Sequence, residues 1–152
     1  MVRAHEAAQG RDIRIIIGSR FTLDDGLNIA LLATNMSGYA QLCRLITHAR
    51  RRAEKGDYRL QRNDLEDKLD NCLALLLPES NEQIEWFKRH FENRAWLAVS
   101  LLREGDDEQR LTRGLRWSAH YEIPLVGVGD VHMHARGRRA LQDVLSAIRL
   151  QK

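Results

Sequence analysis

Residues 73–102 read LALLLPESNEQIEWFKRHFENRAWLAVSLL. The apolar run at residues 73–77 predicts a buried strand, and Pro78 ends it because proline has no backbone N–H to donate to a sheet. Residues 96–102 form a second apolar run that predicts another strand. A strand, a connection long enough for a helix and a second strand are typical of parallel pairing in an α/β fold.

The connection between these strands has the pattern of a helix. Ser80 and Gln83 have the spacing of a capping box, in which the serine oxygen accepts a hydrogen bond from the backbone at the helix start. Ile84, Phe87 and Phe91 then recur at helical spacing, which predicts one apolar face packed on the sheet.

The alternation of strands and helices extends in both directions along the chain. Residues 13–17 and 29–33 are short apolar runs that predict buried strands, and residues 125–128 predict another after Pro124. With no internal repeat or low-complexity linker, we expect residues 1–152 to form one α/β domain with a parallel sheet.

Three further helices are expected from apolar residues at helical spacing. Asn35 or Ser37 can cap the first through its side-chain oxygen. The apolar faces expected for the three helices are Met36, Tyr39, Cys43, Ile46 and Ala49; Leu111, Leu115 and Ala119; and Leu141, Val144, Leu145 and Ile148. Cys43 and Cys72 make neither a disulfide framework nor a zinc cluster, and we expect both to be buried as small hydrophobic residues.

The composition is that of an ordinary folded protein. Of 152 residues, 43% are hydrophobic and 30% are charged, and the formal net charge is +3. Mild positive charge permits a nucleic-acid partner without requiring one. No apolar run approaches the roughly 20 residues that span a bilayer, and residues 1–6 are unlike a signal peptide. We therefore expect a cytoplasmic protein without a membrane partner.

One cluster carries metal-binding chemistry. Asp130, His132 and His134 follow the strand expected at residues 125–128, and functional residues gather at such strand ends in α/β barrels. In an extended segment, Asp130 and His132 point to the same side, as two neighbouring ligands of zinc, manganese or iron would. The alternative is a polar loop whose histidines have ordinary hydrogen-bond partners.

Two arginine clusters could contact phosphates. One is at residues 50–52, and the other contains Arg136, Arg138 and Arg139. The alternative for each is a solvated helix face or helix end. No aromatic residues are interleaved with these arginines, so a stacking site for single-stranded nucleic acid is not indicated.

Several stretches together resemble the PHP (polymerase and histidinol phosphatase) domain of error-prone bacterial C-family DNA polymerases. The most specific is residues 129–136, GDVHMHAR, followed by RRALQDVL at 138–145. IIIGS at 15–19, GY at 38–39 with LCRLIT at 42–47, and RAWLAV at 94–99 occur in the same order as in that family. The match covers nearly the whole chain.

The resemblance implies a distorted seven-stranded β/α barrel and indicates which parts of it this chain contains. It implies that the first barrel strands, with their H-x-H ligand pair, are missing. Asp130 and His132 match the family's final ligand pair, whereas Arg20, Arg50 and Pro78 stand where metal-binding relatives have ligands. Because arginine stays protonated and repels a cation, we expect no cofactor, or a divalent zinc, manganese or iron ion only if the residual ligands suffice.

Three functions therefore remain as hypotheses. The first is a fragment of an error-prone DNA polymerase, without catalysis of its own, whose partners are DNA and the rest of the polymerase. The second is a free-standing, metal-dependent PHP phosphoesterase or nuclease that uses Asp130 and His132. The third is a small basic module that binds nucleic acid or protein. An incomplete barrel would also leave open sheet edges, which favour self-association.

Overall fold

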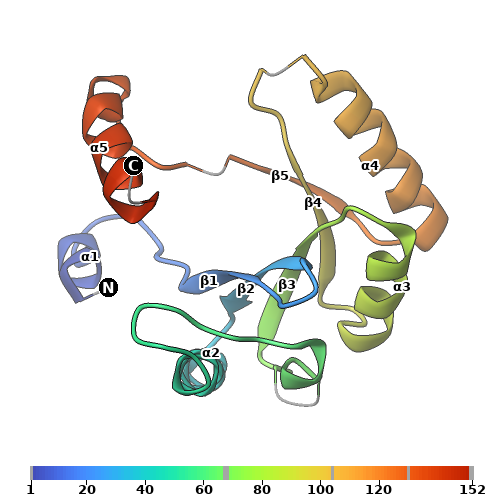
Figure 1. Cartoon of the computed structure of the whole chain (residues 1–152), viewed down its shortest axis with the longest axis horizontal. Coiled ribbons are helices and arrows are strands. Elements are labelled where there is room, and N and C mark those ends of the chain that lie inside the picture. Colours follow the sequence, from blue (N-terminus) through green and yellow to red (C-terminus); the bar gives the residue numbers. More distant parts are fainter. Residues whose placement is uncertain (1, 67–68, 104, 130, 151–152) are drawn as a thin grey trace.

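The computed structural model describes residues 2–66, 69–103, 105–129 and 131–150 (Figure 1). Its centre is a five-stranded sheet whose strands lie in chain order, β1-β2-β3-β4-β5. The strands are β1 (Gly18–Thr22), β2 (Asn28–Ala33), β3 (Cys72–Leu77), β4 (Ala95–Ser100) and β5 (Leu125–Val128). The expected α/β class is therefore confirmed.

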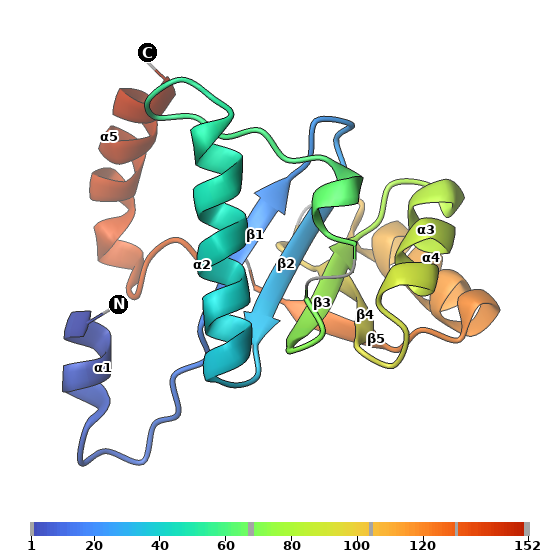
Figure 2. The same cartoon turned by 90° about the horizontal axis from the view of Figure 1, so that it is seen from below.

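Helices precede, connect and follow the strands along the chain. They are α1 (Val2–Ala8), α2 (Met36–Arg51), α3 (Asn81–His90), α4 (Asp107–Tyr121) and α5 (Arg139–Leu150), with short 3-10 turns η1 (Arg62–Asp64) and η2 (Arg136–Arg138). In Figure 2, α2 lies across β1 and β2, whereas α3 and α4 lie beside the β3–β5 half of the sheet. None of the described helices is both long and apolar enough to cross a membrane.

The sheet is mixed, so the expectation of a parallel sheet holds for only part of it. β3, β4 and β5 are parallel, but β2 runs antiparallel to both β1 and β3. The reason for the first reversal is a tight turn between β1 and β2, where Gly26 has a φ of 84° and the Asp25 carboxylate accepts from the Leu27 N–H. A turn this short joins only antiparallel strands, because a parallel pair needs a crossover of a dozen or more residues.

The first expected strand was placed too early in the chain. Residues 13–17 lie outside any strand, Ile13 and Ile16 are 64% and 67% exposed, and β1 begins only at Gly18. The partner strand explains this boundary. β2 ends at Ala33, and Thr34 and Asn35 turn the chain into α2, so residues 13–16 have no neighbouring backbone to pair with.

The hydrophobic core lies on the sheet face that α2, α3 and α4 cover. Alternate strand residues point into it: Phe21, Ile29, Leu31, Cys72, Ala74, Leu76 and Leu97. The helix face predicted for α3 is confirmed, since Ile84, Phe87 and Phe91 are all buried. The predicted cap is present as well, because the Ser80 hydroxyl accepts a hydrogen bond from the Gln83 N–H at 3.3 Å.

Helix α2 buries a different face from the one expected. Its buried residues are Gly38, Leu42, Leu45 and Ala49, while Met36 is 79% exposed and Cys43 is exposed. Of the two cysteines, only Cys72 is buried as predicted. Close packing of Gly38 against the Asn71 backbone sets the rotation of the helix, and the predicted cap is confirmed, with the Asn35 side chain accepting from the Gly38 N–H at 2.9 Å.

The other two apolar faces also differ from expectation. In α4 the buried residues are Gly114 and Tyr121, and Leu115 is exposed, because Gly114 lets the helix approach Leu125 of β5. Helix α5 forms as predicted, but none of its residues is buried. The four apolar side chains of its predicted face, Leu141, Val144, Leu145 and Ile148, are 51–70% exposed.

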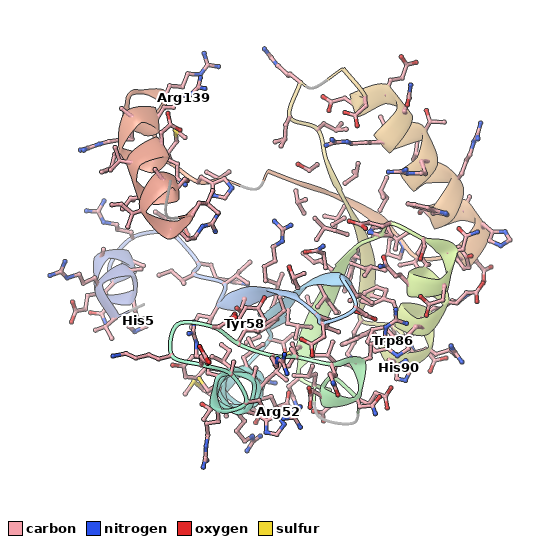
Figure 3. All side chains as sticks on the ribbon, in the orientation of Figure 1. His5, Arg52, Tyr58, Trp86, His90 and Arg139 are labelled. Atoms are coloured by element: carbon pink, nitrogen blue, oxygen red, sulfur yellow. The ribbon has the colours of Figure 1, made fainter. Side chains whose placement is uncertain are left out.

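The segment that connects α2 to β3 is held by polar contacts. The Asp64 carboxylate accepts from Arg52 at 2.8 Å and from the Gln61 N–H at 2.8 Å, which ties η1 to the end of α2. Arg62 binds Asp25 at 2.5 Å, and it also forms an ion pair with Glu82 that lowers the pKa of that carboxyl group. Figure 3 shows Arg52 and Tyr58 on the α2 side of the molecule and Trp86 on the α3 side.

We predict that Gly38→Ala destabilises the protein by about 3 kcal/mol, although alanine alone favours a helix interior by about 1 kcal/mol over glycine. The added Cβ would overlap the Asn71 carbonyl oxygen, which belongs to backbone and cannot rotate away. Chemical denaturation of the full chain measures the change. Gly137→Ala is the control, because a Cβ there meets nothing within 4 Å. Equal stability of the two variants would contradict the close packing of α2.

Candidate functional site: an arginine-lined pocket at the strand ends

The structure brings two of the sequence-predicted site residues, Arg20 and Pro78, to the same pocket. This pocket has a volume of about 230 Å³ and lies where β3 and β4 end. Arg50, the third position expected to have lost a ligand, is exposed on α2 and does not line it. We call this cavity the arginine pocket. Its lining residues are Arg20, Asn28, Leu77, Pro78, Glu79, Ala98, Val99, Ser100, Arg110, Arg113, Gly114, Trp117 and Leu125.

Strand direction explains the position of the pocket. β3 and β4 are parallel, so their carboxyl ends and the residues that follow them meet at one edge of the sheet. β2 is antiparallel to β3, and its first residue, Asn28, pairs with Leu77 at this same edge. Ligands of open α/β sheets commonly bind at the carboxyl ends of parallel strands.

The charged side chains of the pocket are mostly cationic. Arg20, Arg110 and Arg113 face a single carboxylate among the lining residues, that of Glu79. Arg110 is oriented by an ion pair between its Nε and the Asp106 carboxylate at 2.8 Å, one helical turn earlier. Arg20 projects from β1 on the sheet face opposite the buried Phe21, since successive strand residues alternate between faces.

Trp117 gives the α4 wall of the pocket a fixed geometry. Its indole N–H donates to the Asn81 side chain of α3 at 2.7 Å, which ties the two helices together. The guanidinium of Arg113 lies over the Trp117 ring, 5.1 Å from its centre, in a cation–π contact. The tryptophan therefore holds one of the pocket's cations in place.

Ser100, at the end of β4, has an unsatisfied hydroxyl. Its Oγ is buried, and no hydrogen-bond partner for it exists among the described residues. A buried hydroxyl without a partner costs roughly 1–3 kcal/mol, so such groups are uncommon in folded proteins.

The other predicted metal ligands lie elsewhere. Asp130 lies outside the described residues, and His132 is exposed in the loop that follows β5. Within residues 2–66, 69–103, 105–129 and 131–150, there is no group of three or more His, Cys, Asp or Glu residues placed to hold a metal ion. The structure therefore does not test Asp130 and His132 as a ligand pair.

The predicted phosphate contacts, Arg136, Arg138 and Arg139, are exposed on η2 and at the start of α5. Arg139 lies 3.8 Å from the Asp143 carboxylate, one turn further along the same helix. Figure 3 places Arg139 on α5, well away from α4 and the β3–β5 half of the sheet. These arginines therefore form a basic surface separate from the arginine pocket.

The sequence-based prediction missed Arg110, Arg113 and Trp117, although a signal was present. The three residues follow helical spacing in α4, and such spacing brings side chains to one helix face. Because Leu111 and Leu115 are apolar, the expected buried face of α4 was assigned to them instead. Ser100 carried no signal of its own, because only the three-dimensional packing leaves its hydroxyl without a partner.

The sheet and its helices define an α/β protein, and comparison with curated proteins shows which proteins its sequence is similar to. The chain is 48% identical over 151 residues to the error-prone DNA polymerase of Pseudomonas aeruginosa, and 47% identical over 152 residues to that of Alkalilimnicola ehrlichii. These matches cover 98% and 97% of this chain but 15% of each relative. No family model matches the chain.

The resemblance to error-prone DNA polymerases that was stated from the sequence is thus confirmed. Along nearly its whole length, the chain is similar to one fragment of the error-prone DNA polymerases, and it spans about 15% of the length of these relatives.

We predict that Ser100→Ala stabilises the protein by about 1 kcal/mol, because it removes a buried hydroxyl that has no partner. Thermal or chemical unfolding of the full chain measures the effect. Ser80→Ala is the matched control, and it should cost about 1 kcal/mol because it removes the cap of α3. A loss of stability in both variants would show that the Ser100 hydroxyl has a partner in solution.

Proposed function

We propose that the chain is part of the PHP domain of an error-prone DNA polymerase, and that its role there is structural. In this proposal it forms one section of a distorted seven-stranded β/α barrel without the first strands. The observation that carries the proposal is 48% identity over 98% of the chain to an error-prone DNA polymerase. A sheet covered by α2, α3 and α4 on one face is in keeping with a barrel section, because barrel helices lie on the outside.

The complete protein would carry out template-directed DNA synthesis across lesions in the cytoplasm, with DNA and the remaining polymerase segments as partners. The section proposed here would contribute no catalysis and hold no cofactor. Arg20 supports this part of the proposal, since it places a permanent positive charge at the strand ends, where a divalent cation would be repelled.

The proposal includes self-association of the isolated chain. β1 and β5 are the edge strands of the described sheet, and α5 exposes five large apolar side chains among its described residues. Open strand edges and contiguous apolar surface both favour association between chains.

We therefore expect light scattering after gel filtration to give a mass above that of one chain. Leu145→Lys combined with Ile148→Lys should shift the protein toward the monomer, whereas Val131→Lys, at an exposed site outside α5, should not. A monodisperse monomer of the unmodified chain at high concentration would contradict self-association.

The structural role can be tested by segment exchange. Replacing the matching segment of the Pseudomonas aeruginosa polymerase with this chain should leave primer extension on a DNA template close to the unmodified rate, because the segment serves packing rather than chemistry. Asp130→Asn with His132→Asn in the same chimera should leave the rate unchanged, since neither residue is proposed to act in catalysis.

A chimera that folds, as judged by its melting temperature, but does not extend a primer would overturn the structural role. A chimera that is active only while Asp130 and His132 are intact would instead assign them a metal or catalytic function.

A further inference from the structure

We propose that the outer face of α2 is a docking surface for a segment of another protein. The segment carries acidic residues, then an apolar side chain and then a basic residue. They meet, in that order, Arg51 and Arg44 on the helix, a hollow beside the helix, and Asp70 at the edge of that hollow. This inference goes beyond the structural role proposed above and does not depend on it, because it rests on the charges and shape of this surface alone.

Helix α2 carries positive charge that is not compensated locally. None of its residues is acidic, and Arg44 and Arg51 are exposed about two turns apart on the same side of the helix. Among the described residues, neither arginine forms an ion pair, whereas the nearby Asp64 carboxylate lies 2.8 Å from Arg52 and 3.3 Å from the His48 ring. In Figure 2, no described helix or strand covers the side of α2 that faces away from the sheet. Arg44 and Arg51 are therefore able to bind carboxylates of a partner.

A hollow of about 610 Å³ lies beside Arg44, between α2 and the segment that leads to β3. Leu45 of the helix and Leu69 of the connecting segment form apolar parts of its wall. The volume is within the roughly 300–1,000 Å³ of pockets that enclose whole small molecules, so one apolar side chain of a partner fits easily. Burial of such a side chain adds affinity that charge alone would not give.

Asp70 supplies a negative charge at the same hollow. Its carboxylate accepts a hydrogen bond from the Gln41 side chain, which holds the pKa of Asp70 below its ordinary value. The carboxylate is therefore ionised at neutral pH, and it has no cationic partner among the residues that the structure describes. A basic residue of the partner would supply the missing positive charge.

The order of these groups along α2 defines the partner. Gln41, which binds Asp70, lies about one turn before Arg44, and Arg51 lies about two turns after it. A segment that lies along the helix therefore meets two cations, then the apolar hollow and then a carboxylate. DNA matches this order less well, because its backbone repeats a single negative charge and its phosphates would be repelled at the Asp70 end.

The test is fluorescence anisotropy of a labelled peptide titrated with the full chain. The peptide carries a short run of glutamates, then a leucine and then a lysine, and it is made in both chain directions because side-chain charges do not fix the direction. We expect saturable binding of one of the two peptides, weakened by salt. Arg44→Gln combined with Arg51→Gln should weaken it about fivefold, the size expected for the loss of two exposed ion pairs.

The matched control is Arg116→Gln combined with Arg149→Gln. Both arginines are exposed, on α4 and α5, and the pair changes the net charge by the same amount. This variant should bind the peptide as the unmodified chain does, which separates a local contact from an effect of overall charge.

A double-mutant cycle tests the contact with Asp70. Asp70→Asn should weaken binding of the lysine peptide about threefold and leave binding of a peptide with glutamine in place of the lysine unchanged. Glycine in place of the leucine should weaken binding several-fold, because the hollow then stays unfilled. Equal effects of Asp70→Asn on the lysine and glutamine peptides, as a general change in the fold would produce, would contradict the proposed contact.

Other occupants of this face give different results. Duplex DNA that binds more tightly than the peptides and displaces them would assign the face to nucleic acid. Loss of self-association in the variant with Arg44→Gln and Arg51→Gln would assign it to a second copy of the chain. Either result, the absence of saturable peptide binding, or equal affinity of the α2 and control variants would overturn the proposal.

Discussion

Apolar packing between one face of the sheet and helices α2, α3 and α4 is the interaction on which the other features depend. Phe21, Leu31, Leu76 and Leu97 point into this layer from four successive strands and are buried, whereas Leu73, Leu75 and Leu77 point to the opposite face and remain partly exposed. Burial of large apolar side chains contributes about 1.5–3 kcal/mol each, so a layer of this kind holds the sheet together even with its second face open. The open face leaves Arg20 accessible at the sheet edge, and α5 lies apart from the core in both views (Figures 1 and 2).

Polar contacts then select the mixed topology from the arrangements that would bury the same side chains. After α2, the connecting segment leads back to the sheet, and Asn71 fixes the position at which β3 begins. Its carbonyl oxygen accepts from both the N–H and the hydroxyl of Thr34, at 3.0 and 2.8 Å, while Gly38 packs against it. Arg94 donates to the carbonyl oxygens of Leu69 and Cys72, which ties the same point to the start of β4. Buried and partly buried carbonyl groups need such partners, so these contacts fix β3 antiparallel to β2.

The strand and helix positions were largely predictable, because each depends on a local pattern. The runs at residues 29–33, 73–77 and 125–128 and the caps at Asn35 and Ser80 all occur where expected. The face of α2 was not predictable from period alone, since residues 36, 39, 43 and 46 and residues 38, 42, 45 and 49 both follow helical spacing. Only the close approach of Gly38 to the backbone of Asn71, 33 residues away in sequence, determines which of the two faces is buried. The arginine pocket could not be predicted from the sequence for the same reason. Its cations come from β1 and α4, and only the sheet order brings them to one edge.

The arginines also change what the strand ends can attract. A carboxylate or imidazole at position 20 would lower the potential or leave it neutral, whereas Arg20 beside Arg110 and Arg113 raises it at every pH at which the protein is folded, since guanidinium groups do not lose their protons. A negative potential attracts a divalent cation, whereas a positive potential attracts an anionic group such as phosphate. Guanidinium groups at this edge therefore favour an anionic group over a divalent cation, because they supply positive charge themselves.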